Sequence, residues 1–151
     1  MLKQQIDQNL KEALLKGNKE LVTTLRGLKS VILYAEVAQG IRDTGLPDDE
    51  ILKLLAKQSK QRQESADLYL QGGSEERAAA ELSEKAIIDA YLPAQVSDDE
   101  LKKLVDTVVT ELQATSPQAM GPVIAEVKKR AEGTADGARV ARFVKERLQQ
   151  V

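Results

Sequence analysis

The chain has 151 residues, of which 42% are hydrophobic, 3% aromatic and 30% charged. It contains no cysteine and no histidine, which excludes a thiol nucleophile, a Cys/His zinc site, a Ser-His-Asp triad and a disulfide framework. The length suits one domain of ordinary size or two small ones, and the abundance of good helix formers favours an all-α fold. The net charge of −2 gives no overall nucleic-acid signature.

The N-terminal segment carries charges throughout and has neither an apolar stretch nor a cleavage site of the kind found in signal peptides. Nowhere does the chain approach the roughly 18 consecutive apolar residues that a membrane-spanning helix requires. We therefore expect a soluble, cytoplasmic protein that has no membrane partner.

Apolar residues recur every three or four positions in the first part of the chain, which predicts amphipathic helices. The first three stripes are Leu2, Ile6, Leu10 and Leu14; Leu21, Leu25, Leu28, Ile32 and Ala35; and Ile51, Leu54, Leu55, Ala66 and Tyr69. Gly72-Gly73 ends the third helix, and Ser74 is expected to cap a fourth, which turns Leu82, Ala86 and Leu92 or nearby residues inward. These four helices form an N-terminal subdomain of residues 1–95.

Pro93 interrupts the helical pattern, because proline lacks an amide hydrogen and clashes with the preceding turn. Ser97 and Glu100 then form a capping box, with serine at the N-cap and glutamate three residues later. Three further helices are expected, and Asp136 is able to cap the last of them. The sequence thus predicts an all-α protein of two small helical subdomains, with three helices in residues 96–151.

Gln58 and Arg62 lie on the apolar stripe of the third helix, where a cation needs an ion-pair partner or a cleft. One interpretation is a salt bridge from Arg62 to a carboxylate on the preceding helix, for which Glu36 is our choice. The other is a polar groove of Gln58, Arg62 and Glu36 that receives a ligand or another chain.

Residues 121–151 hold seven basic and four acidic residues, a net charge of +3. The candidate nucleic-acid-binding residues flank one loop and are Lys128, Lys129, Arg130, Arg139 and Arg142. The loop residues expected to allow close approach of a sugar-phosphate backbone are Gly133, Asp136 and Gly137. Basic residues near helix ends also complement the helix dipole, so both interpretations stay open. Since no aromatic residue is expected beside them to stack bases, RNA would be recognised by backbone and shape.

We assign no catalytic residue, because without histidine only a lysine could activate a serine, and no Ser–Lys pair is placed to do so. Acidic residues 48–50 and 98–100 lie where helices begin, and negative charge there is ordinary complementation of the helix dipole. We expect no metal and no cofactor.

Several short motifs follow one another through the chain. They are Leu25-Arg26-Gly27-Leu28-Lys29-Ser30 with Glu36, Lys57-Gln58, Lys60-Gln61-Arg62 and Ser65, Tyr91-Leu92-Pro93, and a C-terminal signature of Met120-Gly121, Val123, Gly133, Ala135-Asp136-Gly137, Val140, Val144 and Leu148. Together they resemble the YqeY family over essentially the whole chain, and the C-terminal signature is the most specific part. Pro122 departs from the family pattern and fits only if a helix begins at about that point.

The resemblance implies a helical protein related to the tail domain of the GatB subunit of the glutamine-dependent tRNA amidotransferase. In that enzyme the tail touches the tRNA, while ammonia release and amide transfer occur elsewhere. The carbon–nitrogen ligase activity associated with the family is therefore not expected of this chain itself. We expect a non-catalytic protein that interacts with tRNA or another structured RNA. The alternative is an accessory factor that binds an amidotransferase or another translation protein.

Overall fold

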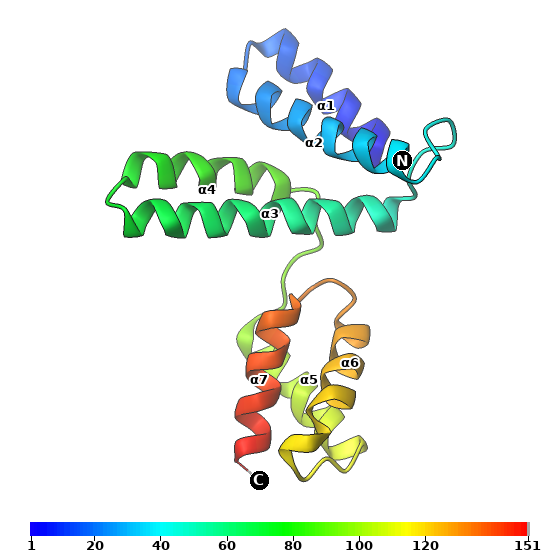
Figure 1. The fold of residues 1–151 in the computed structure, drawn as a ribbon, viewed down its shortest axis with the longest axis vertical. Helices are drawn as coiled ribbons and strands as arrows, with labels where there is room; N and C mark the ends of the chain where they lie inside the picture. Colours follow the sequence, from blue (N-terminus) through cyan, green and yellow to red (C-terminus); the bar gives the residue numbers. More distant parts are fainter. Residues whose placement is uncertain (151) are drawn as a thin grey trace. The chain divides into compact units, whose positions relative to one another are not determined.

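The computed structural model describes residues 1–150, which contain seven α-helices and no strand (Figure 1). The predicted all-α fold is confirmed. The helices form two compact units, Met1–Leu92 and Pro93–Val151. None of the helices in the described residues combines the length and the apolar character that a membrane span needs.

The N-terminal unit consists of two helical hairpins, each formed by neighbouring helices that lie side by side (Figure 1). The first pairs α1 (Leu2–Lys16) with α2 (Lys19–Ala38), and the second pairs α3 (Asp48–Gln71) with α4 (Glu75–Asp89). Gly17 has the left-handed conformation, with φ at 69°, that lets the chain reverse between α1 and α2.

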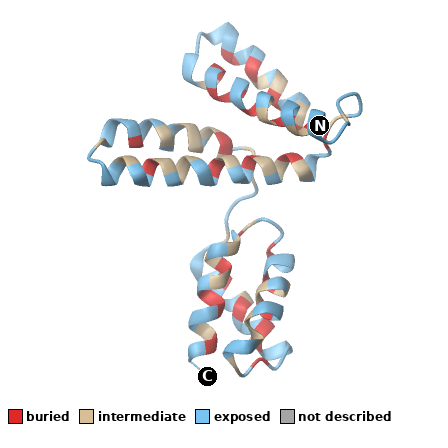
Figure 2. Ribbon diagram, viewed as in Figure 1, coloured by how far each residue is buried: buried red, intermediate tan, exposed pale blue. Residues whose placement is uncertain are grey.

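Buried residues lie on all four helices of this unit (Figure 2), and its core is formed by the apolar ones among them. Leu14 and Leu82, which we expected to face inward, are 50% and 40% exposed, so this part of the prediction is wrong. Residues spaced strictly by four drift around a helix, and three such steps turn Leu14 about 120° away from Leu2. Ala13 is buried in α1 instead, and Ala78 and Ile88 are the buried residues of α4.

The C-terminal unit contains α5 (Asp98–Glu111), a 3₁₀ turn (Pro117–Ala119), α6 (Met120–Ala131) and α7 (Gly137–Gln149). Because α6 begins at Met120, Pro122 lies in its first turn, where a missing amide hydrogen costs nothing. The core of this unit is formed by Leu101, Val105, Val108, Val109, Ala114, Val123, Val127, Ala131, Ala135, Val140, Phe143, Val144 and Leu148.

Both predicted caps in this unit are confirmed. The Ser97 hydroxyl accepts a hydrogen bond from Glu100 N at 3.1 Å, and Ser97 N donates to Glu100 Oε2 at 3.1 Å. Asp136 Oδ1 accepts from Arg139 N at 2.8 Å at the start of α7. Local sequence therefore fixes where α5 and α7 begin.

Candidate nucleic-acid interface

The loop between α6 and α7 is held by its own conformation and by the segment that precedes α5. Glu132 and Gly133 have positive φ, 47° and 81°, so this glycine serves the turn that ends α6. Val96 N donates to Thr134 O at 2.9 Å, and Gln95 Nε2 donates to Gly133 O at 3.4 Å. The loop is thereby anchored to the entry of α5.

Arg139 is bound inside the unit. Its Nη2 donates to Asp98 Oδ1 at 2.7 Å and to Val96 O at 2.6 Å, and its side chain is 19% exposed. The hydrogen bond from Arg139 lowers the pKa of Asp98, against the opposing effect of desolvation. This arginine ties the first turn of α7 to the start of α5.

Arg130 binds two other carboxylates. Its Nη2 lies 2.5 Å from Glu111 Oε2, and its Nε lies 2.9 Å from Glu126 Oε1. Hydrogen bonding to Arg130 lowers the pKa of Glu111. Glu111 is the last residue of α5 and Asp98 the first, so about 20 Å of helix separates the carboxylates that hold the two arginines. The five candidate residues thus do not form a single cluster.

The other three candidates, Lys128, Lys129 and Arg142, are exposed and have no ion-pair partner within the described residues. Lys128 Nζ lies 3.4 Å from the place that a Cβ on Gly137 would occupy, so the absence of a side chain there leaves room for the ammonium group. The Arg142 guanidinium lies 4.9 Å from the centroid of the Phe143 ring. These three cations are free to meet an external anion.

Sequence reasoning missed Lys102 of α5. Its Nζ lies 5.6 Å from the centroid of the Phe143 ring, so it accompanies Arg142, and both charges help to lower the pKa of Asp98. The net charge of +3 was summed over residues 121–151, which excludes α5. The inward stripe that starts at Leu101 nevertheless places Lys102 on the flank of that helix. Phe143 itself is 5% exposed, so its ring supports the cations and cannot stack on a base.

The predicted salt bridge from Arg62 to Glu36 is wrong. Arg62 Nη1 lies 3.4 Å from Glu81 Oε2, and its Nε lies 3.2 Å from Glu84 Oε2, so its partners are on α4. The helical spacing placed Arg62 on a packed face, but it lies about 20 Å along α3 from the start of that helix. At this point the helix beside α3 is α4 (Figure 1).

The predicted polar groove is not formed either, because each of its three residues is bound to a different partner nearby. The side chain of Glu36 is fully buried, and Lys3 Nζ donates to both of its oxygens at 2.9 Å. Gln58 Nε2 donates to Gln61 Oε1 on its own helix at 3.1 Å. Sequence spacing alone could not have identified these partners.

The described residues show no group of three or more acidic side chains that could hold a metal ion. In the C-terminal unit, Asp98 binds an arginine and Asp136 caps a helix. The chemistry open to the exposed ammonium and guanidinium groups is electrostatic binding of anions such as phosphates.

Comparison with known proteins gives a match over nearly the whole chain. The model of a family described as Yqey-like protein matches residues 3–148. A protein of Eremothecium gossypii named "Altered inheritance of mitochondria protein 41, mitochondrial" is 31% identical over 112 residues, which are 73% of this chain and 60% of that protein. The protein of the same name from Clavispora lusitaniae is 31% identical over 108 residues, 70% of this chain and 61% of that protein.

The names of these relatives contradict the cytoplasmic location expected from the sequence, since both are called mitochondrial proteins. The expectation rested on the lack of a targeting segment. The chain spans about 60% of the length of these relatives, so its first residues carry no information about targeting.

Proposed function

The chain belongs to the YqeY family, and we propose that it acts without catalysis, by binding structured RNA through its C-terminal unit. The RNA is held by its phosphate backbone. Transfer RNA is the first candidate, because the chain resembles the tail of the GatB subunit of the tRNA amidotransferase.

The observation that carries this proposal is that the basic residues of the C-terminal unit fall into two groups, those bound to carboxylates and those without an ion-pair partner. Arg130, Arg139 and Arg147 are each bound to carboxylates. The exposed basic residues of this unit that have no ion-pair partner within residues 1–150 are Lys102, Lys103, Lys128, Lys129, Arg142 and Lys145. Such cations neutralise phosphates and release condensed counterions, which drives binding to nucleic acid.

The same side chains determine what kind of recognition to expect. Lysine acts as a flexible point charge, and contacts to phosphates carry no sequence information. The one aromatic ring near the cations, that of Phe143, is buried. The protein therefore recognises the shape and backbone of the RNA, and different tRNAs bind with similar affinity.

A salt titration of tRNA binding, followed by fluorescence anisotropy, tests the proposal. Three to five phosphate contacts give a log–log slope of about −3 to −4.5, by the duplex value of roughly −0.9 per phosphate. A slope close to zero, or no binding at low salt, rejects RNA binding by these basic residues.

A further inference from the structure

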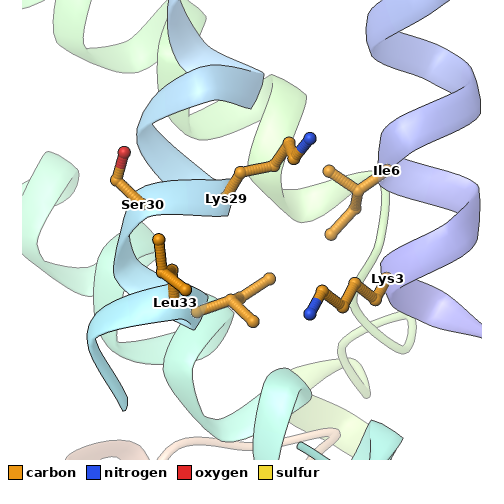
Figure 3. Close-up of a pocket in the computed structure, with 6 residues that line it drawn as sticks. Lys3, Ile6, Lys29, Ser30 and Leu33 are labelled. Atoms are coloured by element: carbon orange, nitrogen blue, oxygen red, sulfur yellow. The ribbon is translucent and has the colours of Figure 1, made fainter. Parts of the chain in front are cut away.

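A pocket of about 200 Å³ opens on the N-terminal unit between α1 and α2 (Figure 3). Its lining residues are Lys3 and Ile6 of α1 and Lys29, Ser30, Ile32 and Leu33 of α2. Ile6 and Ile32 are 0% and 1% exposed and form an apolar floor. An apolar cavity of about 150 Å³ accepts a molecule the size of benzene, so this pocket accepts an apolar side chain.

The pocket continues into an uncovered apolar face of α2. Leu33, Tyr34 and Val37 are 44%, 75% and 56% exposed, and their spacing places them on one side of the helix. Leu33 belongs to both the pocket and this face. Large apolar side chains that lie exposed beside one another are typical of an interaction site.

Gly27 lies in the middle of α2, where a glycine destabilises a helix relative to alanine. A Cβ added to it would meet nothing within 4 Å, so no contact among the described residues requires a glycine there. Ser30 and Tyr34 follow at helical spacing on the same face. The missing side chain leaves room for the backbone of a partner to cross α2 closely at this point.

Two basic side chains, Lys29 and Arg26, lie at the rim of this groove in addition to Lys3, which is bound to Glu36. Lys29 Nζ lies 2.7 Å from Asp7 Oδ1, and both side chains are about 40% exposed, so a partner's carboxylate can share the lysine. Arg26, one turn before Ser30, is exposed and has no carboxylate partner within residues 1–150. The rim is therefore complementary to an acidic partner.

We propose that the α1–α2 groove docks an acidic amphipathic helix of a partner protein. An apolar residue of that helix enters the pocket, its backbone crosses at Gly27 and Ser30, and its carboxylates face Arg26 and Lys29. Helix-in-groove recognition uses such anchors spaced along one apolar face. RNA phosphates would gain nothing from the apolar floor. This inference goes beyond the proposed RNA binding and does not depend on it, because it concerns the other unit.

The test uses the full chain labelled with ¹⁵N and a designed acidic peptide of Leu, Ala and Glu, with the leucines at helical spacing. A peptide of the same composition in scrambled order is the control. We expect saturable shifts of the amide signals of Gly27, Ser30 and Leu33 with the patterned peptide alone.

Two variants locate the binding. Tyr34→Ser removes an exposed anchor, and Gly27→Leu fills the crossing point, where an added Cβ meets nothing within 4 Å. Each should weaken binding about tenfold, as loss of a central contact does. The matched control is Leu68→Ser, which removes another exposed apolar side chain, 67% exposed on α3, and should leave binding unchanged.

Three results overturn the proposal. The first is the absence of saturable shifts in the groove. The second is unchanged binding by Gly27→Leu. The third is that tRNA, rather than the peptide, perturbs the amides of Gly27, Ser30 and Leu33, which would make the groove an RNA surface. Failure of tRNA to bind the C-terminal unit has no bearing on any of these outcomes.

Discussion

Lys3, in the first turn of α1, and Glu36, near the end of α2, form an ion pair in which Nζ lies 2.9 Å from both carboxylate oxygens. The Glu36 side chain is fully buried, whereas that of Lys3 is 40% exposed. Glu36 Oε1 also accepts a hydrogen bond from Leu46 N at 3.1 Å. One buried carboxylate thus joins the start of α1 and the loop after α2, and leaving it without partners would be costly.

This arrangement predicts a loss of stability in acid. The hydrogen bond from Lys3 lowers the pKa of Glu36 from its ordinary value of 4.5, against the opposing effect of burial. A carboxyl whose pKa is lower in the folded state stabilises that state above the unfolded-state pKa. The contribution is lost as pH falls through the folded-state pKa. Glu36→Gln should therefore lower the free energy of unfolding at neutral pH and reduce its decline in acid.

Urea unfolding followed by circular dichroism, at neutral pH and at several pH values below 4.5, measures this effect. Glu20→Gln, an exposed carboxylate in the first turn of α2, is the control. If Glu36→Gln and the parent lose stability in parallel on acidification, Glu36 does not contribute in the way described.

Arg62 should stabilise the second hairpin to a modest degree. Its side chain is 35% exposed, and its removal leaves Glu81 and Glu84 unpaired on one face of α4. We expect Arg62→Ala to cost about 0.5–1 kcal/mol, the range of partly exposed ion pairs. Amide hydrogen exchange should accelerate in residues 63–84. The control is Lys53→Ala, which removes the ion pair between Glu50 and Lys53, a lysine that is 70% exposed. Equal losses of stability in the two variants would contradict this account.

The two subdomains predicted from the sequence, residues 1–95 and 96–151, should be separable by limited proteolysis. Pro93, Ala94 and Gln95 are exposed and lie outside any helix, which is where proteases cut. The C-terminal fragment has its own apolar core and should remain helical by circular dichroism. A fragment that is disordered after cleavage would show that residues 96–151 do not fold alone.

The helices and the caps of α5 and α7 could be predicted because they depend on residues close together in the sequence. Ser74, which we expected to cap α4, precedes that helix but makes no capping hydrogen bond with its side chain. Ser97 and Glu100 form the expected capping box, and Asp136 caps α7. The pair of Arg130 with Glu126 is local, but the pairs of Arg130 with Glu111 and of Arg139 with Asp98 could not be predicted in this way. Those carboxylates lie 19 and 41 positions away, and helix packing decides which ones come within reach.

The same limit explains the candidate site. The sequence shows that residues 121–151 are basic, but it does not show which cations are already bound to carboxylates. Only the packed structure separates the bound Arg130 and Arg139 from the free Lys128 and Lys129. It also brings Lys102 of α5 beside Arg142, because both cations lie over the ring of Phe143.

The salt dependence of tRNA binding by two matched double variants tests the central claim most directly. Lys128→Gln with Lys129→Gln and Arg130→Gln with Arg139→Gln each remove two positive charges from the C-terminal unit, and circular dichroism checks that both variants fold. We predict that the lysine variant flattens the log–log salt slope by about two units and weakens all tRNAs alike, because each lysine contacts a phosphate. The arginine variant should keep the parent slope, because its side chains are bound within the protein. A parent-like slope in the lysine variant, or equal losses in the two, would contradict RNA binding by the free cations.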